Sequence, residues 1–599
     1  MTAQVDVPDV TFQVSHDCAV REPAARQPVE EDDGWCVGIA QSVERERLAR
    51  SQGGEHRGER YDQRVIRDDL STAVRASLTA LGVEPPAEIE LERPRVAEHG
   101  DWSTNVALAT AKAAGRNPRE LAGQLADHLN AADLPHVAKV EIAGPGFVNF
   151  RLHDTWLHEV LRDVVAGGVD DYARPDLGQG ERVMIEFVSA NPTGPLHVGN
   201  GWFASYGDAL ARLFARTGHA VTREYYVNDT GGQVRKFGAS ILARKHGQPV
   251  PEDGYPGEFV AELGARYDGP DEVAAAGRWG GEQVLADIKA TLESINIHYD
   301  EWYSQASIEE SGAVAETIEV LRGKGLVFDR EGATWLRTEE FGDPRKERVV
   351  IKSNGDVTYL GGDIAYHRNK FLIRGYDRVV DVWGADHQAQ VPSLLAAVEA
   401  LGVPRGQLEV KIGQMVSLAS GRMSKRLGNT VDLSELISDI GPDATRLLTL
   451  LSSVDAAPTI DLDMIREQSR ENPVYYVQYA HARIASIHRV AAERGVERVP
   501  LAQVDLTLLV HDRELDILRT LFELPDVMVA ALDERAPHKV TTWVRELADR
   551  FHGFYHDCYV MGEGVSGELT QARLWLVEAV RIGLAIGLDV LGVHAPDSM

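Results

Sequence analysis

The amino-acid sequence predicts an α/β fold built around a parallel sheet, with a small α+β segment before the sheet and an all-helical segment after it. A strand, a loop, a helix and a second strand in succession carry this prediction. Residues 182–189 form a short apolar run typical of a buried strand, and residues 191–195 interrupt regular structure with Asn, Pro and Gly. Residues 202–218 place apolar side chains at helical spacing and end in glycine, and residues 220–227 have the composition of a second strand.

The composition is that of a globular protein without a membrane segment. The chain has 599 residues, of which 44% are hydrophobic and 26% are charged, so several domains have room for their own cores. No run approaches the roughly 20 apolar residues of a membrane helix, and we expect a cytoplasmic protein. The three cysteines show no paired spacing, which predicts neither a disulfide framework nor a structural metal. With a net charge of −30, any nucleic acid must bind locally clustered Lys and Arg.

The first part of the chain differs from the rest. Residues 1–64 show no helical or strand period, and we expect a disordered extension. The alternative is a start near Val65, because residues 34–54 resemble the spurious translation of a tRNA gene.

A small α+β domain is expected over residues 66–155. Residues 70–81 and 118–129 have helical patterns. A strand pair is expected over residues 137–152, broken by a Gly-Pro-Gly run at 144–146.

The sheet region is expected over residues 180–431, with an insertion over about 228–343 that separates the two halves of the sheet. The Asn354-Gly355 pair predicts a hairpin turn where the chain returns to the sheet. After this turn, residues 363–374 are expected to be helical and residues 378–383 to form a strand.

The predicted sheet indicates where a ligand binds. Ligands of open parallel sheets collect outside the carboxyl ends of the strands, where the strand order reverses. Tyr359, Asp363, Asp386 and His387 are predicted to lie at this crevice. A carboxylate there suits a guanidinium, because the two groups pair through two parallel hydrogen bonds. From its position alone, Asp363 is equally a candidate helix cap.

The loop at residues 191–200 leads into a helix N-terminus, which gathers free backbone amides and suits a bound phosphate. His197 and Asn200 are candidates to hydrogen-bond the phosphate oxygens of a nucleotide, and Gly194 and Gly199 allow close backbone approach. A purely structural loop is the competing interpretation at this point.

The same residues carry a resemblance to a known family. The HVGN sequence at residues 197–200 resembles the HIGH signature of class I aminoacyl-tRNA synthetases. The longer runs EFVSANPTGPLHVGN at 186–200 and YYVNDTG at 225–231 resemble the arginyl-tRNA synthetase family in particular. Two positions depart from the family pattern: Asn200 replaces the second His of the signature, and Trp202 stands where many members carry Arg. An Asn side chain still donates hydrogen bonds to a phosphate.

A second signature follows in GRMSKRLGN, residues 421–429, which resembles the KMSKS loop of the class. Arg422 stands in place of the first Lys, and Lys425 matches the second. A basic loop flanked by glycine can close over a triphosphate and neutralise the charge that develops there. A basic loop by itself is usually just solvent-exposed. Its position after HVGN in the chain is the order expected for the two signatures of the class, which strengthens the resemblance.

The end of the chain is expected to be a helical bundle over residues 432–599. Helical patterns occur at 443–451, 473–489, 512–532, 539–556 and 571–588. Tyr475 and Tyr479 are four residues apart with Arg483 nearby, and aromatic rings beside basic groups can stack on unpaired RNA bases. Tyrosines at this spacing also occur in helical cores.

The resemblance implies a Rossmann-like class I catalytic domain, an N-terminal α+β domain that contacts tRNA, and a helical anticodon-binding domain. It implies an arginine–tRNA ligase, with ATP and Mg²⁺ as cofactors and L-arginine and tRNA(Arg) as partners. We expect a monomer, although the sequence does not show the quaternary state. His197, Asn200 and Lys425 are then the catalytic residues. ATP would bind at Gly194, His197, Gly199, Asn200, Met423, Ser424 and Lys425. Arginine would bind at Glu186, Asn191, Tyr359, Asp363 and His387. The tRNA would contact Tyr475, Tyr479 and Arg483.

Two other functions fit parts of the sequence. A catalytically weakened relative that binds tRNA or senses arginine is motivated by the departures at Asn200, Trp202 and Arg422. A nucleotidyltransferase for small molecules also uses an HxGH-type loop, but the large helical segment at the end argues against it.

Overall fold

The computed structural model describes residues 65–94, 96, 99–414, 417–418, 431–456, 459–460, 462–466 and 471–599. The predicted extension at residues 1–64 lies outside the described residues. So do Met423, Ser424 and Lys425 of the second signature.

The first described part is a small α+β unit, as the sequence predicts. Its helices are α2 (Val65–Ala80), α3 (Val106–Ala111) and α4 (Pro118–Ala131). Its antiparallel sheet has the order β1-β3-β2, formed by β1 (Trp102–Thr104), β2 (Val137–Ala143) and β3 (Phe147–Leu152). Helix α4 begins where the Asn117 side chain accepts hydrogen bonds from two backbone amides, with proline at the first helical position. Helix α5 (Thr155–Asp171) leads from this unit to the central sheet.

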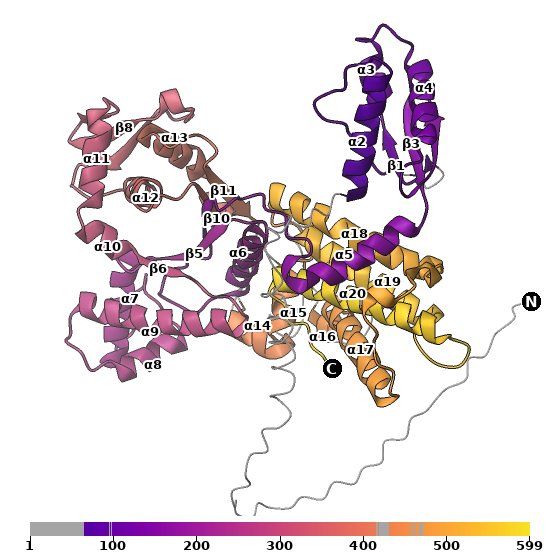
Figure 1. Ribbon diagram of the computed structural model, residues 1–599. Helices are drawn as coiled ribbons and strands as arrows, with labels where there is room; N and C mark the ends of the chain where they lie inside the picture. The colour runs from indigo at the N-terminus through magenta and orange to yellow at the C-terminus, as the bar shows by residue number, and fades with distance from the viewer. Residues whose placement is uncertain are drawn as a thin grey trace, which may run out of the picture. The chain divides into compact units, whose positions relative to one another are not determined.

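The central sheet has five parallel strands in the order β11-β10-β4-β5-β6. They are β4 (Arg182–Glu186), β5 (Ala220–Val227), β6 (Glu301–Ser304), β10 (Arg378–Gly384) and β11 (Leu408–Gly413). The chain adds β5 and β6 on one side of β4, and then β10 and β11 on the other. The strand order therefore reverses between β4 and β10, which is where ligands of this fold bind. Helix α6 (Val198–Arg216) connects β4 to β5, and Figure 1 shows it beside the strands.

The range 228–343 is not simply an insertion between two halves of the sheet, because it contributes β6 to the sheet itself. This strand was not predicted, because it is only four residues long and reads EWYS without apolar alternation. The same range contains α7 (Gly231–Lys245), α8 (Glu258–Arg266), α9 (Val273–Ser294), α10 (Gln305–Glu310) and α11 (Ala313–Gly323). Strands β7 (Val327–Arg330), β8 (Ala333–Arg337) and β9 (Glu347–Ile351) form a separate antiparallel sheet.

The predicted turn at Asn354-Gly355 is present, with Lys352 N donating to Asp356 O at 2.8 Å. The arm after the turn makes one bridge to β9 and then starts α12 (Tyr359–Arg368). The cap of α12 is Thr358, whose Oγ1 accepts a hydrogen bond from Gly361 N at 3.2 Å. Asp363 lies inside the helix, so its alternative assignment as a helix cap is wrong. A π-helical turn, η3 (Asn369–Ile373), extends α12, and α13 (Val391–Leu401) follows β10.

The last part of the described chain is almost wholly helical, as predicted. Figure 1 shows these helices in orange to yellow. They are α14 (Leu433–Ile440), α15 (Pro442–Thr449), α16 (Leu462–Arg466), α17 (Pro473–Glu493), α18 (Asp512–Asp533), α19 (His538–Asp557) and α20 (Gly567–Leu591). Two short strands, β12 (Ser417–Leu418) and β13 (Thr459–Ile460), pair in parallel. Among the described helices, none is long and apolar enough to cross a membrane.

Candidate functional site

The N-terminus of α6 carries the first predicted signature. His197 is the N-cap of α6, and its Nδ1 accepts a hydrogen bond from Asn200 N at 3.3 Å. In return, Asn200 Oδ1 accepts from His197 N at 3.0 Å, which completes a reciprocal capping box. Asn200 therefore performs a defined structural role in this position. A Cβ added to Gly199 would lie only 2.9 Å from Cε1 of His197, so this position favours glycine. A Cβ added to Gly194 would meet no atom closer than 3.7 Å.

This cap fixes how His197 can act. Because Nδ1 accepts a hydrogen bond, the proton of the neutral ring sits on Nε2. Partial burial lowers the pKa of His197, and the carboxylate of Asp432 opposes the shift only in part. The ring therefore presents an Nε2–H donor in front of the helix N-terminus at neutral pH.

The chain after the second signature lies beside the first. Val198 N donates to Val431 O at 3.0 Å, and Leu433 N donates to Leu196 O at 2.8 Å. Residues 431–433, which follow the predicted KMSKS-like loop in the sequence, therefore lie next to the HVGN sequence.

Four carboxylates form a row across the central sheet. In the strand register, Asp381 of β10 pairs with Glu186 of β4, Glu186 with Glu224 of β5, and Glu224 with Glu301 of β6. Residues in register on parallel strands point to the same face of the sheet. The row crosses the point between β4 and β10 where the strand order reverses.

Two cations at the end of α12 pair with the carboxylates of this row: Lys370 lies in the π-helical turn and Arg374 directly follows it. Lys370 Nζ lies 2.6 Å from Glu186 Oε2 and 2.9 Å from Asp381 Oδ1, and its side chain is 0% exposed. Arg374 donates to both carboxylate oxygens of Glu224 and also contacts Glu301. The π-helical turn changes the helical spacing just where Lys370 lies, a feature that often marks functional sites.

His367 and Tyr366 complete the contacts of the row. His367 Nε2 lies 2.8 Å from Asp381 Oδ2, and its Nδ1 lies 2.7 Å from the Asp363 carbonyl oxygen. The Tyr366 hydroxyl donates to Glu224 Oε1. Burial alone would raise the pKa of Asp381, but Lys370 and His367 outweigh this effect and lower the pKa to about 2. This carboxylate is thus ionised and already committed to its partners.

Asp363 differs from the carboxylates of the row. It is partly buried on α12, and among the described residues no hydrogen bond or ion pair engages its carboxylate. Burial raises its pKa to about 6, and the charges of Glu186 and Asp381 add to the effect while His367 and Lys370 oppose it. A carboxylate without a partner, next to carboxylates that are already paired, can receive a cation.

The predicted arginine-site residues Glu186 and Asn191 lie on either side of a strained turn. Val188 has φ 70° and Ser189 has φ 41°, and a left-handed conformation at a β-branched residue is uncommon outside functional sites. Ser189 Oγ holds the turn by donating to Glu186 Oε1 at 2.9 Å and accepting from Tyr226 N at 3.1 Å. The turn thereby orients Glu186 and leaves Asn191 exposed.

The structure does not bring the other two predicted arginine contacts into the buried cluster. Tyr359, the first residue of α12, is 81% exposed. His387 and Asp386 are exposed after β10, where His387 Nε2 lies 3.3 Å from Asp386 Oδ2. The His387 ring also meets the edge of Trp383, with centroids 6.1 Å apart.

A second candidate site lies in the helical part. The rings of Tyr475 and Tyr479 on α17 stack with centroids 5.6 Å apart, and Arg483 lies over the rings of Tyr479 and Tyr555, 4.4 Å from each centroid. Beside them is a cavity of about 510 Å³. Arg483, Arg494, Tyr555, Tyr559 and Met599 are among its lining residues.

Sequence reasoning missed several of these residues. Lys370 and Arg374 read as ordinary solvent-exposed charges of a helix, although an acidic residue within each of the strands β4, β5 and β10 was a usable signal. The cavity residues Tyr555 and Tyr559 lie about 80 positions after the Tyr475 motif, so only the tertiary fold brings them together.

Three family models match the chain. The arginyl-tRNA synthetase N-terminal domain matches residues 68–152, and the class I (R) tRNA synthetase catalytic domain matches residues 166–251 and 282–468. The DALR anticodon binding domain matches residues 477–599. The three models follow one another along the described chain without overlap.

Whole proteins resemble the chain over nearly their full length. The arginine–tRNA ligase of Carboxydothermus hydrogenoformans is 41% identical over 560 residues, covering 90% of this chain and 99% of that protein. The arginine–tRNA ligase of Moorella thermoacetica is 44% identical, covering 85% and 93%. Among solved structures, Thermus thermophilus arginyl-tRNA synthetase matches with a TM-score of 0.71 and 22% identity, covering 89% of this chain and 100% of that one. This last likeness supports the fold.

Proposed function

The chain belongs to the arginyl-tRNA synthetase family, and from this membership we propose which of its residues carry out each part of the reaction. The enzyme is an arginine–tRNA ligase. The carboxylate of arginine attacks the α-phosphate of ATP, which gives arginyl-adenylate and releases pyrophosphate. The terminal 2′-hydroxyl of tRNA(Arg) then takes the arginyl group and releases AMP.

Asp363 is proposed to bind the guanidinium of arginine. The observation that carries this proposal is its partly buried carboxylate, which has no partner among the described residues while the neighbouring carboxylates are paired with Lys370 and Arg374. A guanidinium offers two parallel N–H groups that match the two oxygens of a carboxylate. Lysine offers a point charge that cannot reproduce this geometry.

Glu186 and Asn191 are proposed to hold the amino-acid end of arginine, next to the strained turn at Val188. Glu186 already accepts hydrogen bonds from Lys370 and Ser189, so a substrate ammonium would be a further donor to a carboxylate that is fixed in place. Tyr359 and His387 belong to the same proposal, because they lie at the start of α12 and after β10, the elements that bound the crevice.

His197, Asn200 and Lys425 are proposed to stabilise the phosphate charge during adenylate formation. The support is the capping box that fixes His197 and Asn200 at the start of α6, the Nε2–H of the neutral His197 ring and the position of residues 431–433 beside this loop. Gly194, Gly199, Met423 and Ser424 complete the proposed ATP site. No covalent nucleophile is needed, because the anhydride forms directly between the two substrates and catalysis rests on positioning and electrostatics.

Mg²⁺ is proposed to accompany ATP. Within the described part of the chain, no group of three or more His, Cys, Asp or Glu side chains is arranged to hold a metal ion. In this proposal the ion enters as a complex with ATP, whose phosphate oxygens are the hard ligands that Mg²⁺ prefers.

The cavity beside α17 is proposed to receive an unpaired base of the tRNA anticodon. Its support is the stacked pair Tyr475 and Tyr479, the guanidinium of Arg483 above Tyr479 and the 73% exposed ring of Tyr559. Bases stack on aromatic rings and on guanidinium planes.

We also propose a role for each part of the chain. Residues 66–155 contact the tRNA, residues 180–431 catalyse the reaction and residues 432–599 bind the anticodon. The enzyme is proposed to work as a monomer in the cytoplasm.

Arginine-dependent exchange of pyrophosphate into ATP, run with and without tRNA, tests the arginine site. Asp363→Asn should raise the KM for arginine by about 30-fold or more, because an uncompensated cation then lies in the site at a cost of roughly 2–5 kcal/mol. Asp386→Asn is the matched control, since Asp386 is exposed and should leave the KM within twofold. If Asp386→Asn raises the KM for arginine and Asp363→Asn does not, the guanidinium site lies at Asp386. A wild-type protein without exchange activity would instead favour a relative that only binds tRNA or arginine.

A further inference from the structure

Arg446 is a fully buried cation in α15, far in sequence from the residues that surround it. Its side chain is 0% exposed, and its NH2 group lies 2.6 Å from Oδ2 of Asp208 on α6. The two residues are 238 positions apart. A buried ion pair of this kind joins the segment after the second signature to the helix that begins with the first.

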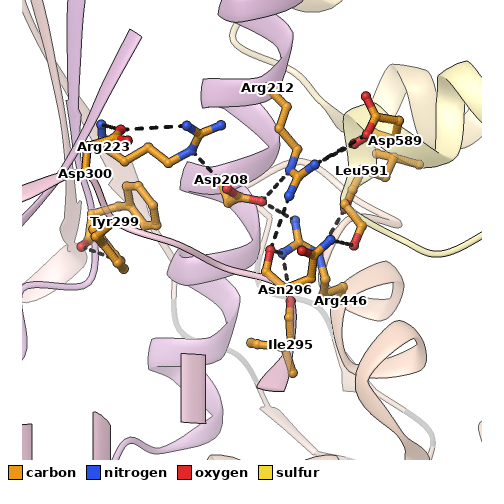
Figure 2. Close-up of polar contacts among 12 residues, drawn as sticks. Asp208, Arg212, Arg223, Ile295, Asn296, Tyr299, Asp300, Arg446, Asp589 and Leu591 are labelled. Atoms are coloured by element: carbon orange, nitrogen blue, oxygen red, sulfur yellow. Dashed lines mark hydrogen bonds and ion pairs between the residues drawn. The ribbon is translucent and has the colours of Figure 1, made fainter. Parts of the chain in front are cut away.

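The other donors of Arg446 bind backbone carbonyls from two further segments. Its NH1 group donates to Ile295 O at 2.9 Å and to Asn296 O at 3.0 Å, and its Nε donates to Leu591 O at 3.1 Å. Figure 2 shows this guanidinium between the loop before β6 and the end of α20. Only the planar five-donor group of arginine can serve these directions at once.

Asp208 is the centre of the same cluster. It is buried, and it also binds Arg212 Nε at 2.7 Å and Arg223 Nε at 3.1 Å. Burial raises its pKa, but the three guanidinium groups lower it more, so the pKa lies below the usual range. Figure 2 shows Asp208 facing all three arginines. The carboxylate therefore stays ionised and holds Arg446 at a fixed height along α6.

The segment 431–449 thus contacts α6 at two levels. Near the start of α6, Val198 N and Leu196 O bond to residues 431 and 433. Near its middle, Asp208 bonds to Arg446. Two contacts at different points along α6 fix both the position of residues 431–449 along the helix axis and their orientation relative to α6. A single contact would leave the orientation free.

We propose that Arg446 is a positioning residue for adenylate formation, which sets the register between residues 431–449, the segment after the second signature, and the proposed phosphate-binding start of α6. It acts through Asp208, away from the substrates. The proposal rests on the assignment of His197 to the phosphates. Stability alone is a weak reason for such a pair, because buried ion pairs are often replaceable by apolar residues at little cost.

The test is pyrophosphate exchange by Arg446→Lys at saturating tRNA. Lysine keeps the charge but cannot reach Asp208 and the three carbonyls together. We expect kcat to fall about tenfold or more while the KM for arginine stays within twofold, because arginine is held by α12 and the turn after β4. Asp208→Asn keeps the shape of the carboxylate and should show the same split. An unchanged kcat in the folded variants would overturn the proposal.

A matched control separates positioning from general loss of a buried pair. Arg573 on α20 lies 2.7 Å from the buried Glu514 of α18, with no contact to α6 among its ion pairs. Arg573→Met should lower the melting temperature and leave kcat of exchange within twofold. If it lowers kcat as much as Arg446→Lys does, the effect at Arg446 is ordinary destabilisation and the proposal fails.

A double-mutant cycle with His197→Ala identifies the route of the effect. If Arg446 acts through the start of α6, adding Arg446→Lys to His197→Ala should lower kcat by less than about twofold more. If the two effects multiply in full, Arg446 does not act through His197 and the proposal is overturned. An unaltered kcat in His197→Ala alone would contradict the assignment of His197 to the phosphates, which is a separate result.

Discussion

Lys370 Nζ lies 2.6 Å from Glu186 Oε2 inside the protein, although the two residues are 184 positions apart. The contact joins the π-helical turn after α12 to the end of the strand that leads into the HVGN loop. It also shares the lysine with Asp381. Each carboxylate of the acidic row is thus paired before the substrate arrives. Asp363, whose carboxylate has no partner among the described residues, stands out as the place for a further cation.

Lys370→Met should destabilise the protein by about 3–5 kcal/mol at pH 7.5, because it leaves two buried carboxylates without their cation. The deficit should shrink as the pH falls towards 5, where those carboxyls can protonate. The measurement is the urea unfolding midpoint at both pH values. The control is Lys539→Met, which removes an exposed pair with Glu534 and should cost less than about 1 kcal/mol. Equal effects of the two substitutions would contradict the buried pairing.

Asp363→Asn should stabilise the protein without arginine at pH 7.5. The folded-state pKa of Asp363 is raised to about 6, so the fold favours its protonated form and loses stability as the pH rises from about 4 to about 6. Removing the charge should recover about 1–3 kcal/mol above pH 6 and nothing near pH 4. Thermal melts of both proteins across this range check the sign. A mutant less stable at pH 7.5 than the wild type would show that the carboxylate has a partner.

The kcat/KM for arginine should rise with pH through about 6 and then level off, because the free enzyme must present an ionised Asp363 to the guanidinium. Below this pH the carboxyl is protonated and loses its attraction for the cation. The profile is measured by pyrophosphate exchange at subsaturating arginine between pH 5 and 8. Asp363→Asn should abolish this limb, and a mutant that keeps it would assign the limb to another group.

Removal of residues 1–64 should leave aminoacylation nearly unchanged. These residues show no foldable pattern, and the first family model begins at residue 68. The truncated protein and the full chain are compared in tRNA charging at equal concentration. A loss of tenfold or more, about 1.4 kcal/mol in the barrier, would give the extension a role in the reaction.

The sequence predicted elements whose pattern is local and missed those that depend on tertiary contact. The strand at residues 220–227 was predicted and is β5 (Ala220–Val227), because its apolar composition identifies it alone. Strand β6 was missed, because four residues without alternation become a strand only through pairing with β5. Lys370 and Arg446 were missed for the same reason: a charged residue in a helix reads as solvent-exposed until its distant carboxylate is known.

The candidate site was predictable where motifs are contiguous. The pairing of His197 with Asn200 lies within four residues of sequence, and the prediction that both residues sit at a helix N-terminus is confirmed. The roles of the individual site residues stay predictions, since they depend on how substrates bind. Asp363 was predicted from its place at the expected crevice and from the family resemblance, but its lack of a partner among the described residues became visible only with the contacts of its neighbours.

The discrimination between arginine and citrulline tests the central claim most directly. Citrulline has nearly the shape of arginine, but its side chain is neutral and offers no cation to Asp363. The ratio of kcat/KM for the two amino acids in pyrophosphate exchange is measured for the wild type and for Asp363→Asn. The account predicts that the mutation lowers this ratio by about 100-fold, on the order of 3 kcal/mol. A folded mutant with an unchanged ratio would contradict the assignment of Asp363 to the guanidinium.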